Sequence, residues 1–499
     1  MFPAIRLMLK SIACSLLTFA LPSFHLLGTL LPAASSPRNG QATHFVTQPA
    51  TRLQERQVPD RPLHLAGIMD GQPLPPIAVL ASTPLQISKQ APRSIVANSE
   101  LMTPEILQQS WDAYRQRFIQ ADGRVIDWEA EARTVSEGQA YAMLRAVLAD
   151  DHDTFERTFR WAENNLKVPV ASATHPPNLD SAPAHSLWAW KWGQTPQGDW
   201  GILDANFASD ADLDAITALI LASRRWNRPD YLTIARTKLV DLWHLSSLEI
   251  AAGDRPTQRY FLPGPLTAFR PTPDQLYLNP SYLAPYAFRL FAQVDPNRDW
   301  LSLVDSSYAV LTDSTQISPV RLPADWIMLN LKTGQFRPTP AEFPLRSVYS
   351  FDAFRVWWRV SWDASWFQEP RAQAFLEQHL VHLAELWRSN QMIPARISLR
   401  GRPLVPYEAT AQYAMLYPAF QSVDRSIAAQ IRQQKLLTTY DNGIWDNDSA
   451  YYVQNLAWLG LFPAAEVNPA WLRPNSGAQN SGAQNSGAQN SGAQSHGTR

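Results

Sequence analysis

The sequence is short of cysteine and of charge clusters. Its only cysteine among 499 residues is Cys14, so the chain offers no internal disulfide framework. Lys and Arg total 43 against 44 Asp and Glu, with no basic block, so nucleic acid is not an expected partner. The histidines lack metal-like spacing, and no Gly-rich phosphate loop or Ser-His-Asp arrangement stands out. We therefore expect neither a metal ion nor a nucleotide cofactor.

Aromatic residues, by contrast, are abundant. The chain has 19 Trp and 15 Tyr, and 45% of its residues are hydrophobic, which is enough for one large domain or two smaller ones. Trp and Tyr combine a flat apolar face with a polar edge, which suits the core of a helical protein and equally suits stacking against sugar rings. We expect most of them to lie in the core.

The N-terminus has the pattern of an export signal. Arg6 and Lys10 precede an uncharged, mostly apolar run over 11–34, which ends in small residues. We expect residues 1–35 to be removed near Ser35, which predicts a periplasmic or extracellular protein. The alternative is an uncleaved anchor, the one expected link to a membrane, but proline and glycine make the run a poor membrane helix. Cleavage would also remove Cys14, in keeping with an oxidising compartment reached without disulfides.

Two further segments are of low complexity. Residues 36–98 are rich in Pro, Gln and Ser and show little periodicity, which predicts a flexible spacer. From Asn475 the pentapeptide Asn-Ser-Gly-Ala-Gln occurs four times in succession, so a disordered tail is predicted over 473–499. These predictions confine the folded protein to 99–472.

The folded span has helical periodicity throughout. Apolar residues at spacings of three and four predict twelve helices, at 103–119, 136–150, 153–166, 210–226, 229–245, 280–293, 297–312, 350–361, 370–389, 408–420, 422–436 and 448–460. Strand signals are short, as at 260–262 and 327–329. Twelve helices predict an all-α domain, either a solenoid or a closed double ring of six hairpins. No repeat of fixed length is visible, which disfavours the solenoid.

Three acidic residues stand at the start of predicted helices. Glu137 opens the second helix, Asp210 the fourth and Asp352 the eighth. In a double ring, alternate helices form the inner layer and run in one direction, so these acids would meet at one end of the inner ring. Carboxylates gathered from distant parts of the sequence are what acid and base catalysis on a neutral substrate requires.

The segments around these acids resemble the motifs of glycoside hydrolase family 8. The resemblance rests on 136–143, 208–214 and 352–359, and the stretches 190–193, 278–282 and 451–452 are most similar to endoglucanases that accompany bacterial cellulose synthases. It runs in order over about 101–462. It implies an (α/α)6 barrel that hydrolyses β-1,4-linked glucan with inversion at the anomeric carbon. A β-1,4-linked polysaccharide is then the expected ligand, a cellulose synthase complex is a candidate partner, and we expect a monomer.

The resemblance also assigns roles to individual residues. It implies that Glu137 is the general acid, that Asp352 is the base with Arg355 beside it, and that Asp210 holds the sugar at the cleavage point. One departure is Phe351, where relatives usually carry Tyr. If that hydroxyl helps to place water or substrate, this chain is expected to be slower or to use another group. The expected substrate-binding residues are Arg355, Trp190, Trp192, Tyr282, Tyr413, Tyr451, Tyr452 and Asp212.

The chemistry sets an electrostatic requirement. An inverting cut needs one protonated and one ionised carboxyl about 6.5 to 9.5 Å apart, with a water between them. The start of a helix favours the ionised form of Glu137, so another effect must raise its pKa. Asp210 as a like charge, or burial against Trp190 or Trp192, would do so. Arg355, one turn after Asp352, would keep the base charged.

Other readings of the same residues remain open. Acids in a first helical turn are common for helix stability alone, and Asp352 with Arg355 could be a surface ion pair at helical spacing. Trp190 and Trp192 could stack on sugar or belong to the core. The same mechanism could act on xylan, mixed-linkage glucan or chitosan. A reading of another class is a glucan-binding protein that has lost catalysis.

Overall fold

The computed structural model describes residues 102–168 and 185–473. The predicted leader 1–35 and spacer 36–98, and the tail from residue 474 onward, lie outside the described residues. Among the residues that are described, no helix is long and apolar enough to cross a membrane.

Helices make up most of the regular structure of the described residues, and short strands lie in the connections between them. The helices are α3 (Thr103–Phe118), α4 (Ser136–Leu148), α5 (His152–Asn165), α6 (Ser209–Arg225), α7 (Pro229–Ser246), α8 (Leu266–Phe269), α9 (Pro285–Val294), α10 (Trp300–Ser314), α11 (Phe351–Phe367), α12 (Pro370–His379), α13 (Val381–Asn390), α14 (Thr410–Val423), α15 (Arg425–Ile431) and α16 (Tyr451–Leu461). The strands are β1 (Thr134–Val135), β2 (Ala189–Gln194), β3 (Trp200–Phe207), β4 (Ser247–Ala252), β5 (Arg255–Phe261), β6 (Gln275–Leu278), β7 (Ile327–Asn330), β8 (Gln335–Arg337), β9 (Tyr440–Asp441) and β10 (Ile444–Trp445).

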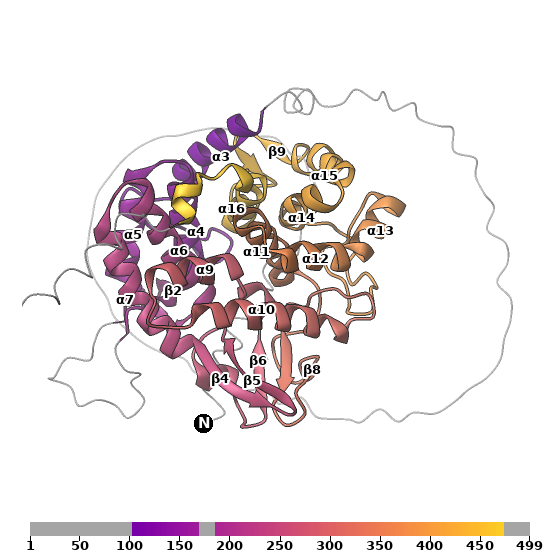
Figure 1. The fold of residues 1–499 in the computed structure, drawn as a ribbon. Coiled ribbons are helices and arrows are strands. Elements are labelled where there is room, and N and C mark those ends of the chain that lie inside the picture. Colours follow the sequence, from indigo (N-terminus) through magenta and orange to yellow (C-terminus); the bar gives the residue numbers. More distant parts are fainter. Residues whose placement is uncertain (1–101, 169–184, 474–499) are drawn as a thin grey trace, which may run out of the picture. The chain divides into compact units, whose positions relative to one another are not determined.

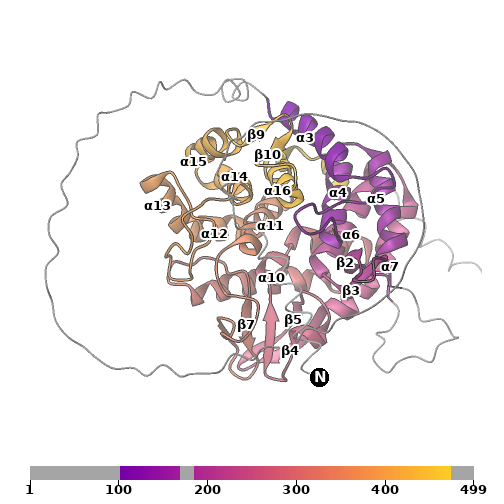
Figure 2. The ribbon, with the colours of Figure 1, turned by 180° about the vertical axis from the view of Figure 1, so that it is seen from behind.

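Six helices of the described chain form a closed inner ring. In order, α4, α6, α9, α11, α14 and α16 each contact the next, and α16 contacts α4. The helices α5, α7, α10, α12, α15 and α3 pack outside α4, α6, α9, α11, α14 and α16 respectively. Figures 1 and 2 show this inner set surrounded by the outer set from two opposite sides. The predicted (α/α)6 barrel and its alternation of inner and outer helices are confirmed.

The burial of each helix explains its layer. Every residue of α4 except Glu137 is buried, and every residue of α6 except the partly buried Arg224 and Arg225 is buried, as expected of helices that are covered all round. The outer helix α5 buries only one face. Close approach within the inner ring depends on small residues: a Cβ on Gly460 of α16 would lie 2.1 Å from the carbonyl oxygen of Ala414 on α14. The core therefore sits between the two rings.

Three predicted helices are interrupted. The helix expected over 280–293 is a 3-10 turn, η1 (Pro280–Tyr282), followed by α9, because the residue before Pro285 is unfavourable in a helical conformation. The helix expected over 370–389 is divided at Leu380 into α12 and α13. The one expected over 422–436 ends in a π-helical turn over Arg432–Leu436. Asn279 caps η1 through a bond of 3.0 Å from the Ser281 amide to its side-chain oxygen.

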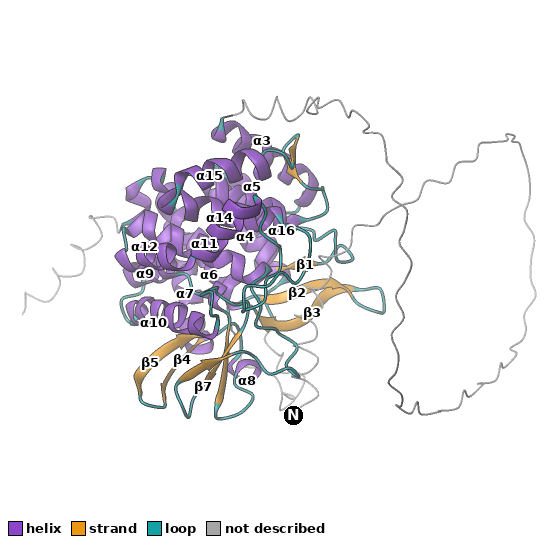
Figure 3. Ribbon diagram, turned by 90° about the vertical axis from the view of Figure 1, so that its right-hand side faces the viewer, coloured by secondary structure: helices purple, strands orange, loops and turns teal. Residues whose placement is uncertain are grey.

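Short antiparallel sheets fix the starts of the inner helices. β1 pairs with β2 and β2 with β3, with Val135 opposite Lys191, and a second sheet has the order β6-β7-β8. β1 runs directly into α4, and β3 leads into α6 after one residue. Most of the strands lie together below the helices in Figure 3. The strand signals noted at 260–262 and 327–329 correspond to the end of β5 and to β7.

Candidate active site

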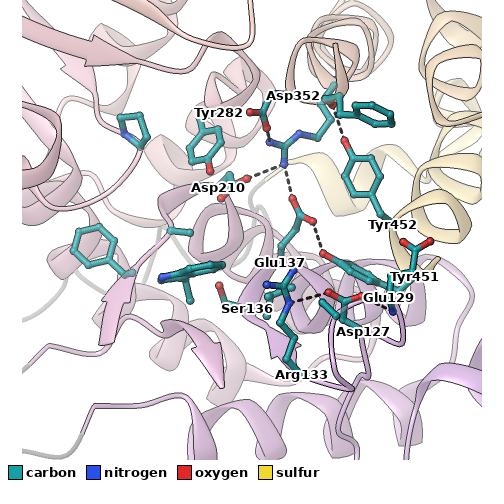
Figure 4. Close-up of a pocket in the computed structure, with 18 of the residues that line it drawn as sticks. Asp127, Glu129, Arg133, Ser136, Glu137, Asp210, Tyr282, Asp352, Tyr451 and Tyr452 are labelled. Carbon is teal, nitrogen blue, oxygen red and sulfur yellow. Dashed lines mark hydrogen bonds and ion pairs between the residues drawn. The ribbon is translucent and has the colours of Figure 1, made fainter. Parts of the chain in front are cut away.

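The first turns of α4, α6, α11 and α16 line a cavity that opens to solvent, and its space, with the open solvent at its mouth included, is about 1010 Å³. α4 contributes Glu137, α6 contributes Asp210, and α11 contributes Asp352 and Arg355. The cavity is also lined by Tyr282 of η1, by Tyr451 and Tyr452 of α16, and by Trp190 of β2. Figure 4 shows the three acids pointing toward one another from different helices. The fold thus brings together the acids that are far apart in the sequence.

A single guanidinium joins the three carboxylates. Arg355 Nη1 donates to Glu137 Oε2 at 2.7 Å and to Asp210 Oδ2 at 2.8 Å, and its Nη2 donates to Asp352 Oδ1 at 2.7 Å. The Arg355 side chain is 2% exposed, and the side chains of Asp210, Asp352 and Glu137 are 3%, 8% and 20% exposed, so the bonds to the two aspartates are shielded from water and the bond to Glu137 is partly shielded. The surface ion pair that the spacing of Asp352 and Arg355 also allowed is therefore excluded.

Glu137 and Asp352 bind different nitrogens of Arg355. Two bonds of 2.7 Å and the width of one guanidinium limit the separation of the bonded oxygens to about 8 Å. A separation close to this limit would leave room for a water between two catalytic carboxyls, which requires about 6.5 to 9.5 Å.

Glu137 has the properties of a proton donor. Burial raises its pKa to about 7, Arg355 opposes this effect, and the negative charge of Asp210 adds to it. Its second oxygen, Oε1, accepts from the hydroxyl of Tyr451 at 3.0 Å. A hydroxyl can turn and accept instead, so Tyr451 is compatible with both protonation states of the carboxyl. The like charge of Asp210 that was expected from the sequence is present, and burial acts in the expected direction.

Asp352 is surrounded by donors. Arg355 Nη2 bonds to Oδ1, and Trp326 Nε1 donates to Oδ2 at 3.0 Å. Neither group can accept a proton, so both bonds favour the ionised carboxylate. Burial nevertheless raises the pKa of Asp352 above its ordinary value, and Arg355 opposes this shift without cancelling it. The sequence predicted the effect of Arg355 on the base but did not predict that the same arginine also binds Glu137.

Several buried polar atoms of the residues that line the cavity have no partner in the described chain, among them atoms of Ser136 and Trp190. The Ser136 hydroxyl and the Trp190 indole nitrogen form no hydrogen bond within the described chain, although the residues are only 1% and 8% exposed. Ser136 is the first residue of α4 and does not cap the helix, which has Val135 at its N-cap position. Such atoms lose free energy unless a ligand or water bonds to them. They are suited to the hydroxyls of a sugar.

The tyrosines of the cavity are held in place by specific contacts. The Tyr282 ring lies 5.4 Å from the Arg355 guanidinium, and the Tyr452 hydroxyl donates to the backbone oxygen of Phe351 at 2.7 Å. Phe351 itself lines the cavity. A tyrosine hydroxyl thus lies beside Phe351, the position at which the resemblance led us to expect a Tyr.

Three predicted substrate-binding residues do not line the cavity. Asp212 lies two residues after Asp210, more than half a turn around α6, and accepts from the Trp188 amide at 3.1 Å. Burial raises the pKa of Asp212 to about 7. Tyr413 points into the outer layer, where its hydroxyl accepts from the Ile393 amide at 2.8 Å. Helical periodicity predicted which helix carries Asp212 and Tyr413 and how far along the barrel they lie, but it did not predict which way their side chains point.

Trp192 is the third of these residues. It stacks on Trp200 with ring centroids 5.1 Å apart, and the edge of Trp161 contacts it at 5.2 Å. The pairing of β2 with β3 is irregular on both sides of Lys191, which breaks the simple alternation of faces between Trp190 and Trp192. Only Trp190 therefore lines the cavity.

The structure adds residues that the sequence analysis did not identify. Asp127 and Arg133 form an ion pair of 2.9 Å on the cavity wall, and Glu129 lies beside them. Burial raises the pKa of Glu129 to about 7, and Asp127 adds to this shift. Asp127 lies only nine residues before the start of α4, so its closeness to a predicted helix start could have pointed to it. No sequence signal marked Trp326. In residues 102–168 and 185–473, no three His, Cys, Asp or Glu side chains are grouped to hold a metal.

Comparisons with known proteins agree with this geometry. The family described as glycosyl hydrolases family 8 matches residues 90–397. An endoglucanase of Xanthomonas axonopodis pv. citri is 34% identical over 283 residues, 56% of this chain and 66% of that protein. An endoglucanase of Pseudomonas fluorescens is 31% identical over 251 residues, 50% of this chain and 58% of that protein. The match thus spans less than two thirds of either relative.

A solved structure has the same fold. The endo-1,4-D-glucanase of Vibrio fischeri ES114 superposes with a TM-score of 0.56 at 24% identity, covering 72% of this chain and 97% of that chain. The coverage shows that nearly the whole of that protein corresponds to the barrel described above.

Proposed function

Because the chain belongs to glycosyl hydrolases family 8, we propose that it is an endo-β-1,4-glucanase that cleaves cellulose-type glucan with inversion. The observation that carries the proposal is the contact of Glu137, Asp210 and Asp352 with one guanidinium inside one cavity. A purely structural ion pair would need one carboxylate. Three carboxylates around one buried cation, two of them buried and that of Glu137 partly exposed, leave negative charge in excess, and that excess can hold a proton for catalysis.

Glu137 acts as the general acid. With a pKa raised to about 7 it keeps its proton near neutral pH and can give it to the leaving glycosidic oxygen. Tyr451 remains bonded to the carboxyl on both sides of this transfer, because its hydroxyl can donate or accept. The reorganisation of the acid during the step is therefore small.

Asp352 acts as the base. Its carboxylate is fixed by Arg355 and Trp326, which only donate, so it is oriented in the ionised form. It takes a proton from a water that attacks the anomeric carbon on the face opposite to the leaving group. Burial, which raises its pKa, makes it a stronger base than an exposed aspartate.

The sugar at the cleavage point is held by the remaining groups. Asp210 is placed to accept from a sugar hydroxyl, and Tyr282 offers a ring beside the same guanidinium. The unpaired donors of Ser136 and Trp190 gain hydrogen bonds when the polysaccharide enters. Each of these groups gains a contact when the sugar binds, so each should lower the free energy of the occupied cavity relative to the empty one.

The test is the release of reducing ends from carboxymethylcellulose. Glu137→Gln and Asp352→Asn should each lower kcat by about 10²- to 10⁴-fold, since each removes one proton-transfer group while preserving its shape. Asp299→Asn, at the cap of the outer helix α10, is the matched control and should match the wild type. NMR of the first product gives the anomeric configuration. Wild-type rates in both cavity variants would refute the assignment.

The same assay separates the other readings. Faster release from xylan, mixed-linkage glucan or chitosan than from carboxymethylcellulose would keep the mechanism and change the substrate. A folded wild type that binds cello-oligosaccharides but cleaves none of these polymers would indicate a glucan-binding protein.

The location and the protein partner are part of the same proposal. The leader over residues 1–35 supports export, and N-terminal sequencing of the protein recovered outside the cytoplasm tests for cleavage near Ser35. A synthase that extrudes β-1,4-glucan is the partner whose product would reach the cavity, and co-purification of the two tests that association.

A further inference from the structure

The helix that carries the base does not cap itself. α11 begins at Phe351 with Ser350 at the N-cap position, yet the Ser350 side chain makes no capping bond to the helix. Asp352 is the second residue of α11, so the direction of its carboxylate depends on how the first turn is held. Free amides at such a helix start require an acceptor from elsewhere.

Asp325 supplies that acceptor. Its Oδ1 accepts from the Ser350 amide at 3.0 Å and from the Ala353 amide at 2.8 Å. Its Oδ2 accepts from the Ser350 hydroxyl, which explains why that hydroxyl does not cap the helix. The Asp325 amide in turn donates to the Val348 oxygen at 2.7 Å. One buried carboxylate thus binds the residues on both sides of Asp352.

The neighbouring residue holds the carboxylate itself. Trp326 donates to Asp352 Oδ2, and its ring stacks on Phe269 at 5.7 Å within a separate apolar cluster. β7 begins at the next residue and lies in the middle of its three-stranded sheet. Asp325 and Trp326 therefore directly precede the central strand of a sheet, and between them they bond to the backbone beside Asp352 and to its side chain.

We propose that Asp325 is a positioning residue that sets the orientation of Asp352 by capping α11 from outside the helix. Asp325 is not among the residues that line the cavity, so it acts through Asp352 and not on the sugar. The inference rests on the proposed function of Asp352 as the base. A misplacement of about 1 Å in a catalytic group can cost about 10²-fold in rate, which sets the scale of the effect.

The test uses the full chain and three variants. Asp325→Ala removes the cap, Asp325→Asn keeps an acceptor for the two amides, and Asp424→Ala removes a comparable carboxylate cap far from the cavity. Asp424 accepts from the Ser426 and Ile427 amides, each at 3.1 Å, at the start of the outer helix α15. Thermal unfolding identifies a temperature at which every variant is folded, and the kinetics are measured there.

Asp325→Ala should lower kcat on carboxymethylcellulose by about 10- to 100-fold, with KM changed by less than about threefold. Asp325→Asn should recover most of kcat, and Asp424→Ala should keep the wild-type value. A purely structural cap would lower the unfolding temperature in both alanine variants and leave kcat unchanged. A wild-type kcat in Asp325→Ala would overturn the proposal. So would a loss of kcat in Asp325→Asn or in Asp424→Ala as large as the loss in Asp325→Ala.

A second measurement does not depend on activity. Hydrogen exchange of a peptide over 348–356 should be faster in Asp325→Ala than in the wild type, and unchanged in Asp424→Ala. Unchanged exchange in Asp325→Ala would overturn the proposal, because the amides of α11 would then not depend on this cap. Full activity in Asp352→Asn would instead refute the proposed function, while the exchange result would still report whether Asp325 holds the helix.

Discussion

Two arginines one turn apart on α11 have opposite roles. Arg355 faces the cavity and divides its donors among three carboxylates from three helices. Arg359 lies one turn deeper, is fully buried, and uses both terminal nitrogens on the single carboxylate of Asp214. The number of carboxylates around each guanidinium, and not the residue type, is what differs.

We call the contacts of Arg355 the upper layer and those of Arg359 the lower layer, and the charge balance of each layer follows from these contacts. With every group ionised, the Arg355 layer would carry an excess of two negative charges, whereas Arg359 and Asp214 neutralise each other. A buried excess of negative charge favours proton uptake, which is the condition for a general acid. The deeper pair is closed and offers no such site. The upper layer is therefore organised for proton transfer and the lower one for stability.

The largest expected difference between the layers is in activity. Arg355→Gln should lower kcat by about 10²- to 10³-fold, because it leaves three carboxylates without their shared cation and raises the pKa of both Glu137 and Asp352. The acid limb of the pH profile should then move to higher pH, since Asp352 must be ionised to act. Reducing-end assays across pH measure both effects. An active Arg355→Gln variant with an unchanged profile would contradict the comparison.

The free energy of unfolding should depend on the deeper pair of Arg359 and Asp214. Arg359→Gln leaves Asp214 buried without its partner and should lower the free energy of unfolding by about 3 to 5 kcal/mol. Replacing both partners, as in Arg359→Met with Asp214→Leu, should restore much of that loss. Urea denaturation gives the values. A single variant as stable as the wild type would show that the deeper pair does not have the role assigned to it.

The pH profile tests the upper layer more finely. In the proposed mechanism activity requires protonated Glu137, whose pKa is raised to about 7, so kcat/KM should fall as pH rises through about 7. Asp210→Asn removes a negative charge that helps to raise this pKa, so the basic limb should move to lower pH by about one unit. The position of the limb is independent of any loss in rate. A limb that stays in place or moves to higher pH would be contrary to the scheme.

The sequence predicted the upper layer only in part. Glu137, Asp210 and Asp352 could be placed at one end of the barrel because helical periodicity and acids at helix starts are local signals. The bond from Arg355 to Glu137 joins residues 218 positions apart, and the spacing to Asp352 alone suggested an ordinary i,i+3 pair. Asp325 carried no local signal, since it meets α11 only through the fold.

The direction of side chains was harder to predict than their depth. Asp212 was grouped with Asp210 because both begin the same helix, yet a separation of two residues turns it away from the cavity. Trp190 and Trp192 share a strand, and the irregular pairing of β2 separates them. Periodicity gives the layer of a residue, whereas bulges and tertiary contacts decide what the residue faces.

The smallest effect compares two tryptophans, one in each layer. The indole nitrogens of Trp190 and Trp358 are both buried without a partner, but only Trp190 lines the cavity. Trp190→Phe should raise KM by about 2- to 10-fold, because a sugar hydroxyl loses a donor worth about 0.5 to 1.5 kcal/mol. Trp358→Phe should leave KM unchanged, since no substrate reaches the layer of Arg359, over which its ring lies at 4.0 Å. Cello-oligosaccharide kinetics measure both variants, and equal values of KM would mean that the unpaired donor of Trp190 is not used by the sugar.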